Sequence, residues 1–199
     1  MKLIIFDMGG VVCEKADFVP SIVAHLGISE GRFYALVGQT DLKLLFCGLI
    51  SEGEFWQRFS RNYGCTVNQD LWKMFFHPRL NREVVELIVQ LHRHVRVVVD
   101  TNTINSHYVS LAEMEWYGLF DALYVSNKMA VAKPALEFYE RILTAESCTP
   151  DESLLIDDTE GNVASAEAMG LHGILFSDVN DLREWLAAYA SIPPDSPWS

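Results

Sequence analysis

The chain has 199 residues, half of them hydrophobic, and a formal net charge of −12 at pH 7. This length suits a single domain with an insertion, or a core domain with a small second unit. The acidic charge argues against extended contacts with nucleic acid or with an anionic membrane, because both require a basic face. A small phosphorylated metabolite remains compatible with it, since a metal ion and a few local cations can reverse the field inside one pocket.

The apolar segments and the cysteines favour a cytoplasmic protein. The N-terminal apolar run, Leu3–Phe6, is too short for a signal peptide or a membrane span, and no other segment approaches spanning length. The cysteines are widely separated and form no CxxC pair, which disfavours a zinc cluster or a dense disulfide framework. Free thiols in a reducing cytosol are therefore expected for Cys13, Cys47, Cys65 and Cys148.

The first predicted element is a strand, Leu3–Phe6, and a helical segment follows it. Residues 14–78 contain no convincing strand and several helical patterns, with Gly27, Gly48 and Gly64 as expected helix ends. The sequence Ser51–Glu54 predicts a capping box at the start of one helix. We therefore expect an all-α cap over residues 14–78, inserted after the first strand, where ligands bind in open α/β sheets.

Strands and helices alternate in the remainder of the chain. Besides the first strand, the expected strands are Val95–Val99, Ala122–Val125, Ser153–Ile156 and Gly173–Phe176. The expected helices are Arg82–Leu91, Ser106–Tyr117 ended by Gly118, Pro134–Leu143 with Pro134 in its first turn, Asn162–Met169 and Asp181–Tyr189. This alternation predicts an α/β fold with a doubly wound parallel sheet, formed by residues 1–13 and 79–192, and a loose tail over 193–199.

Polar residues follow four of the predicted strands. They are Asp7, the run Asp100–Asn102, Lys133 and the pair Asp157–Asp158. In a parallel sheet these positions converge on one edge. A carboxylate there can act as a nucleophile, a lysine can stabilise the charge of a transferring phosphoryl group, and crowded carboxylates call for a hard cation such as Mg²⁺. The pattern therefore indicates phosphoryl transfer.

These same residues resemble a known family. Phe6–Val11, Thr101-Asn102, Lys133-Pro134 and Asp157–Asn162 resemble, in order, the four motifs of haloacid dehalogenase-like hydrolases. The predicted sheet and cap resemble the Rossmann-like core and helical cap of that family. Gly48–Phe55, and Thr101–Thr103 with the later His107, resemble one branch. That branch includes small sugar-phosphate phosphatases and the phosphatase domain of soluble epoxide hydrolase.

The resemblance implies roles for five residues around the phosphate. Asp7 would be the catalytic nucleophile, and Lys133 would steady both Asp7 and the phosphoryl group. Thr101 would bind phosphate and take part in catalysis. Asn102 and His107 would lie next to the substrate.

The resemblance also implies a Mg²⁺ site. Its ligands would be the carboxylates of Asp7 and Asp158 and the backbone carbonyl of Gly9, with Asp157 behind them. Phosphatases of the family usually carry a second Asp where this chain has Gly9, and that Asp protonates the leaving group. General acid catalysis is worth ~10²–10⁴-fold. Residues that could replace the acid are Glu14, Asp17 and His107.

The sequence therefore predicts a Mg²⁺-dependent phosphatase that hydrolyses a small phosphate monoester, such as a sugar phosphate or a nucleotide, through an aspartyl-phosphate. One alternative is a metal-independent 2-haloacid dehalogenase, which also lacks the second Asp and would need a basic residue near the pocket. Basic residues of the insert are Arg32, Lys43 and Arg58. Another alternative is a non-catalytic protein that binds a phosphorylated ligand. The sequence specifies no oligomeric state.

Overall fold

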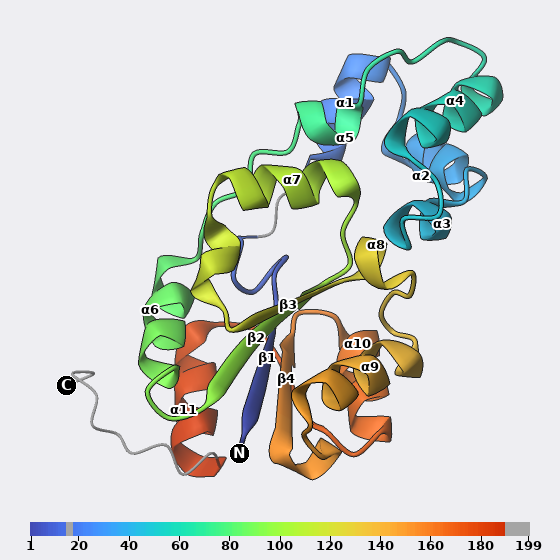
Figure 1. Cartoon of the computed structure of the whole chain (residues 1–199). Coiled ribbons are helices and arrows are strands. Elements are labelled where there is room, and N and C mark those ends of the chain that lie inside the picture. The colour runs from blue at the N-terminus through green and yellow to red at the C-terminus, as the bar shows by residue number, and fades with distance from the viewer. Residues whose placement is uncertain (15–17, 190–199) are drawn as a thin grey trace.

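The fold is built on one parallel sheet (Figure 1). The computed structural model describes residues 1–14 and 18–189. Its strands are β1 (Leu3–Asp7), β2 (Arg96–Thr101), β3 (Ala122–Val125), β4 (Ser153–Asp157) and β5 (His172–Leu175). They pair in parallel in the order β3-β2-β1-β4-β5. The doubly wound parallel sheet is thus confirmed, with each strand end within two residues of its predicted position.

Helices cover both faces of the sheet because the strands are apolar on both sides. Ile4 and Phe6 pack with α6 and α11, whereas Leu3 and Ile5 pack with α9 and α10. The bounds of these helices are α6 (Arg82–Leu91), α9 (Leu136–Glu146), α10 (Glu160–Ala168) and α11 (Val179–Tyr189). The alternation of side chains along a strand thus produces two separate hydrophobic cores.

Two predicted helices differ from the observed ones. The expected helix Ser106–Tyr117 is shorter, because α7 (Asn105–Glu113) ends before Glu115, whose left-handed φ of 60° is incompatible with helix continuation; a 3-10 helix, Trp116–Leu119, follows. Pro134 is not in the first turn of α9, because Ala135 is extended, with ψ of 130°, and the helix begins after it. The structure also contains a short helix that was not predicted, α8 (Ser126–Met129).

The segment after β1 is helical, as predicted, over its described residues 18–78, which we call the helical insert. Its helices are α1 (Val19–Leu26), α2 (Glu30–Gly38), α3 (Leu42–Phe46), α4 (Glu52–Tyr63) and α5 (Leu71–Met74). They lie beyond the carboxyl ends of the strands (Figure 1). They enclose a hydrophobic cluster of their own that includes Phe33, Phe55, Trp56, Phe59 and Trp72. The insert is thus placed above the edge of the sheet where the polar residues converge.

The ends of the insert helices follow the predicted signals in part. Gly27 and Gly64 end α1 and α4 with left-handed φ angles of 68° and 85°. Ser51 accepts a hydrogen bond from the backbone N–H of Glu54 at 3.2 Å. The carboxylate of Glu54 contacts Arg58, so only half of the predicted capping box forms.

The chain leaves and re-enters the core at adjacent points. The backbone N–H of Glu14 donates to the carbonyl of Arg79 at 2.8 Å, and that of Asn81 donates to the carbonyl of Val12 at 2.9 Å.

All four cysteines are free. Within residues 1–14 and 18–189 no helix combines the length and apolar character needed to cross a membrane. The predicted tail, 193–199, lies outside the described residues.

Candidate active site

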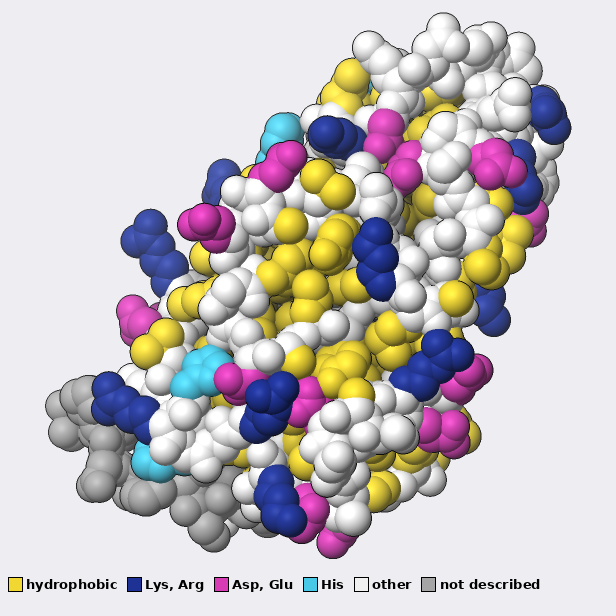
Figure 2. All heavy atoms as spheres, viewed as in Figure 1, with side chains coloured by type: hydrophobic (Ala, Val, Ile, Leu, Met, Phe, Trp, Pro, Cys, Tyr) yellow, Lys and Arg dark blue, Asp and Glu magenta, His cyan; other side chains and the backbone are white. Residues whose placement is uncertain are grey.

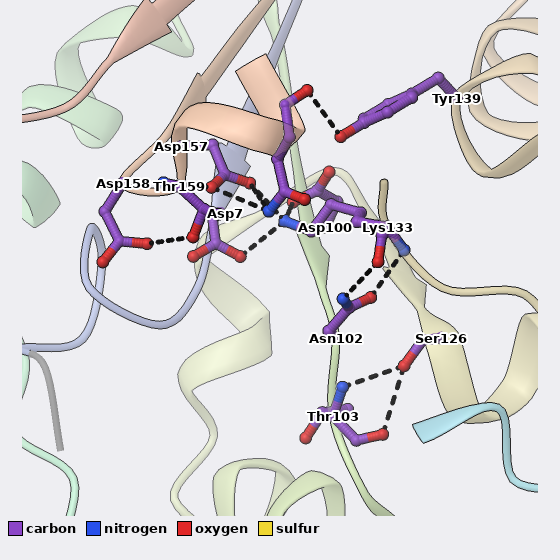
Figure 3. A network of polar contacts seen from close by, with 11 residues as sticks. Asp7, Asp100, Asn102, Thr103, Ser126, Lys133, Tyr139, Asp157, Asp158 and Thr159 are labelled. Carbon is purple, nitrogen blue, oxygen red and sulfur yellow. Dashed lines mark hydrogen bonds and ion pairs between the residues drawn. The ribbon is translucent and has the colours of Figure 1, made fainter. Parts of the chain in front are cut away.

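Three aspartates meet where β1, β2 and β4 end. Asp7 and Asp157 are the last residues of their strands, and Asp100 lies opposite Asp7 in the register. One carboxylate oxygen from each lies within 4.8 Å of the others. The Lys133 ammonium, from the loop between α8 and α9, donates to Asp7 Oδ1 at 2.8 Å, Asp100 Oδ1 at 2.6 Å and Asp157 Oδ2 at 2.7 Å (Figure 3). We call these four residues the carboxylate–lysine cluster.

The carboxylate–lysine cluster carries excess negative charge away from water. Asp100 and Asp157 are fully buried, and Asp7 and Lys133 nearly so. Burial raises the pKa of Asp7, against the attraction of the Lys133 ammonium. Burial opposes the charge of Lys133, yet its carboxylate neighbours raise its pKa well above the ordinary value. One ammonium cannot offset three carboxylates, so full ionisation of Asp7 requires further positive charge nearby.

Asp157 is held inside the protein by hydrogen bonds. Besides Lys133, its carboxylate accepts from the Asn162 Nδ2 at 3.0 Å to each oxygen and from the backbone N–H of Thr159 at 2.8 Å. The Tyr139 hydroxyl donates to the Asn162 carbonyl at 3.1 Å. These contacts occupy the oxygens of Asp157 and fix its orientation toward Lys133.

Asp158 lies against the turn that follows Asp7. A Cβ atom built on Gly10 would fall 2.3 Å from Asp158 Oδ2, and Gly10 has a left-handed φ of 91°. Only glycine satisfies both conditions, because any side chain would displace this carboxylate. Asp158 is not one of the three carboxylates that lie within 4.8 Å of one another, which are those of Asp7, Asp100 and Asp157. The expected ligand set of Asp7, Asp158 and the Gly9 carbonyl therefore stays a prediction, and its oxygen donors are of the kind that Mg²⁺ prefers. The uncompensated negative charge also fits a divalent cation.

The residues at the end of β2 and directly after it have side chains in different surroundings. Thr101 is buried at the strand end, one residue beyond the aspartate that contacts Lys133. The side-chain amide of Asn102 donates to the Lys133 carbonyl and accepts from the Lys133 N–H, both at 2.9 Å. This amide therefore positions the lysine loop (Figure 3). The N–H of Thr103 donates to Ser126 Oγ at 3.0 Å.

A cavity of about 370 Å³ lies between this sheet edge and the helical insert. His107 lines it from α7; its Nε2 lies 3.0 Å from the Trp72 carbonyl, so that nitrogen donates, and its ring stacks on Phe76 at 3.8 Å. Burial lowers the pKa of His107, which favours the neutral ring. Glu14 also lines the cavity and is exposed. Asp17 lies outside the described residues.

Three contributing residues received no role from the sequence. Asp100 stands directly before Thr101, and its position at a strand end was the available signal. Asn162 comes five residues after Asp157, in the first turn of α10, where it can reach back to that carboxylate. Ser126 joins the Thr103 N–H to the carbonyl of Phe46 in the insert, at 3.0 and 2.6 Å. These two hydrogen bonds of Ser126 join segments far apart in the chain, so no sequence pattern indicates them.

Comparisons with known proteins agree with this geometry. The chain is 26% identical to sesquiterpene phosphatase astK of Aspergillus oryzae, over 89% of this chain and 90% of that protein. It is 23% identical to D-ribitol-5-phosphate phosphatase of Bacteroides thetaiotaomicron, over 94% of this chain and 97% of that protein. A solved structure of the HAD family enzyme bt-2542 from Bacteroides thetaiotaomicron, in complex with magnesium and inorganic phosphate, has a TM-score of 0.75. It is 22% identical, and the match covers 92% of this chain and 98% of that one.

The family model that matches spans the sheet, the insert and all four sequence motifs. It is that of haloacid dehalogenase-like hydrolases, and it matches residues 4–176. The match therefore includes Asp7, Thr101, Lys133 and Asp158. The chain belongs to the haloacid dehalogenase-like hydrolases.

Proposed function

We propose that the protein is a Mg²⁺-dependent phosphatase that hydrolyses a small phosphate monoester through an aspartyl-phosphate on Asp7. The observation that carries the proposal is the Lys133 ammonium, bonded at once to Asp7, Asp100 and Asp157. Such a group orients one carboxylate for attack and supplies charge where a phosphoryl group would arrive. Curated relatives named as phosphatases support the same reaction.

In this proposal the carboxylate of Asp7 attacks phosphorus, and the bond from phosphorus to the ester oxygen breaks. Lys133 holds Asp7 in position and, with Thr101, stabilises the oxygens of the transferring group. Water then attacks phosphorus, releases inorganic phosphate and restores Asp7. Mg²⁺, held by Asp7, Asp158 and the Gly9 carbonyl, would supply the positive charge that the buried carboxylates lack.

The leaving group must take up a proton, and Gly9 provides none. Glu14 is the described carboxylate that lines the cavity near this position, and it is our candidate for the general acid. His107 is a weaker candidate, because burial lowers its pKa and its Nε2 already bonds Trp72. We include in the proposal that residues 14–78 act as a cap over the reacting group, and that the protein works in the cytosol, where its free thiols stay reduced.

The dehalogenase alternative finds less support in the cavity. A haloacid substrate carries a carboxylate that needs a cation, yet no Lys or Arg is among the described residues that line this space. Of the three basic candidates, Arg58 pairs with Asp41 and Glu54, Arg32 lies over Tyr63, and Lys43 is exposed. The phosphatase reaction requires no such cation in the insert.

The test is hydrolysis of phenyl phosphate with and without Mg²⁺, comparing the unmodified protein with Asp7→Asn. An aryl leaving group needs little protonation, so the assay reports on Asp7 even without the acid at position 9. We expect Mg²⁺-dependent phosphate release that Asp7→Asn abolishes. The matched control is Asp151→Asn, an exposed aspartate away from the carboxylate–lysine cluster, which should retain full activity. Release that survives Asp7→Asn, or no release with any metal, would overturn the proposal.

A further inference from the structure

The cavity above the sheet edge lies beside the proposed phosphate site. Its base is lined by Gly9 and Gly10, which come shortly after Asp7, by Thr101, which ends β2, and by Asn102, which follows it. A Cβ atom built on Gly9 would meet nothing within 4 Å, so the space beside the nucleophile is open. A phosphate at Asp7 would therefore direct its ester oxygen, and the alcohol attached to it, into this cavity.

The walls of the cavity are apolar. The helical insert contributes Phe18, Val37, Leu42, Phe46 and Trp72 to the wall, and the core contributes apolar residues that include Ile104 and Leu111. Figure 2 shows hydrophobic side chains gathered in a hollow, in the region that α7 and the carboxyl ends of the strands occupy in Figure 1. Such a lining favours ligands that bury apolar surface.

Three of the polar groups near the walls are already engaged, whereas the buried Trp72 Nε1 has no hydrogen-bond partner among the described residues. The Asn102 amide bonds Lys133 at both ends, the Thr103 N–H bonds Ser126, and His107 Nε2 bonds Trp72. Hydroxyl groups of a sugar would lose water here and gain few partners, which is unfavourable. The described lining residues include no Lys or Arg, so a second phosphate group would also find no cation among them.

We propose that this cavity receives the alcohol part of the substrate, and that the substrates are monophosphate esters of apolar, uncharged alcohols. This inference rests on the proposed phosphatase function and narrows it. Sugar phosphates and diphosphate esters are correspondingly poor substrates. The insert then determines specificity by the apolar surface it offers, while the sheet edge performs the same reaction on every ester.

The test is a series of n-alkyl monophosphates from ethyl to decyl, assayed with Mg²⁺ beside phenyl phosphate and ribose 5-phosphate. These alkyl esters have leaving groups of closely similar basicity, so chain length reports on contact with the cavity. We expect kcat/KM to rise about threefold per added methylene until the cavity is filled. Ribose 5-phosphate should be hydrolysed ~100-fold less efficiently than decyl phosphate.

A matched pair of variants locates the effect. Leu42 begins α3 and lines the cavity, whereas Leu136 begins α9 and is exposed away from it. Leu42→Gln should flatten the dependence on chain length, and Leu136→Gln should leave it unchanged. A flat series in the unmodified protein, or a preference for ribose 5-phosphate, would overturn this inference while phenyl phosphate hydrolysis upholds the phosphatase. If the unmodified protein does not hydrolyse phenyl phosphate, both this inference and the proposed phosphatase function are wrong.

Discussion

The carboxylate–lysine cluster and the apolar cavity above it are built in opposite ways. The cluster comes from the ends of three strands and one core loop, and a single ammonium ties its carboxylates together. The cavity is lined by residues of the insert on one side and of the core on the other, through side chains that offer apolar surface and few hydrogen bonds. In the proposed function, the sheet edge would therefore carry the reaction through directional ion pairs and hydrogen bonds, whereas the insert would select the alcohol through non-directional apolar contact.

The largest effect should follow from removing the central cation. Lys133→Met leaves three buried carboxylates without their ammonium, which should lower the free energy of unfolding by about 3–5 kcal/mol. It should also reduce phenyl phosphate hydrolysis at least ~10²-fold. Urea unfolding and steady-state kinetics measure the two quantities separately.

Lys128→Met is the matched control, because Lys128 is exposed and contacts only the surface groups of Asn105 and Tyr108 among its recorded partners. It should change unfolding by less than about 0.5 kcal/mol. If both variants lose the same small amount of stability and activity, the Lys133 ammonium does not hold the three carboxylates in the way that we describe.

The next effect concerns an aspartate introduced at position 9, which should act on the leaving group and not on the attack by Asp7. Gly9→Asp has room for its side chain, since a Cβ there meets nothing within 4 Å. If Gly9 is what slows poor leaving groups, this variant should hydrolyse alkyl phosphates ~10²-fold faster and phenyl phosphate hardly faster. Gly9→Asn, which has a similar shape and no acidic proton, should give no such gain. Equal gains for both esters would mean that protonation is not the step that position 9 limits.

Metal binding should stabilise the sheet edge. Mg²⁺ at 100 times its Kd would add about 2.7 kcal/mol, which raises Tm by roughly 5–10 °C in a chain of this size. Differential scanning fluorimetry with and without EDTA measures this shift. Asp158→Asn should remove most of it, and the distant Asp151→Asn should retain it. A shift that is unchanged in Asp158→Asn would place the metal elsewhere.

The smallest effect concerns a hydrogen bond between the helical insert and the core. Glu52, in the insert, accepts a hydrogen bond at 2.6 Å from the Ser106 N–H in the first turn of α7. Glu52→Gln removes a negative charge from a helix N-terminus, worth about 0.3–1 kcal/mol, and should lower Tm by roughly 1–3 °C. Thermal melting should show a smaller change for Glu54→Gln, from the same turn of α4. A larger loss in Glu54→Gln would contradict the role of Glu52 as the connecting residue.

The sheet and the residues at its strand ends were predictable because buried parallel strands are short apolar runs that end in polar residues. The sequence placed Asp7 and Asp158 directly after strands and Thr101 and Lys133 near the same edge, and the structure brings Lys133 to Asp7. The catalytic and metal-binding roles of these residues stay predictions. The sequence could not indicate that the Asn102 amide bonds the Lys133 backbone, since 31 residues separate the two. The family resemblance placed the Asn102 side chain next to the substrate, and this role stays a prediction.

The cavity was beyond sequence analysis for a related reason. Which faces of short helices point toward one another depends on their packing, so no sequence signal marks Phe18, Leu42 and Phe46 as cavity-lining residues. The helix boundaries at Glu115 and Ala135 depend on single backbone angles, which local propensity does not determine. Gly48 was expected at a helix end and follows α3 with a left-handed φ of 65°, but its close approach to Asn127, whose carbonyl oxygen would lie 2.2 Å from a Cβ, has no sequence signal.

The central claim is that Asp7 becomes covalently phosphorylated during turnover. The direct measurement is to quench the enzyme in acid while it hydrolyses phenyl phosphate, reduce acyl-phosphates with borohydride, and locate the modified residue by peptide mass spectrometry. We predict reduction of the Asp7 side chain, dependent on substrate and on Mg²⁺, and absent in Asp7→Asn. Phosphate release without any modification of Asp7, or modification of another carboxylate in its place, would contradict the account.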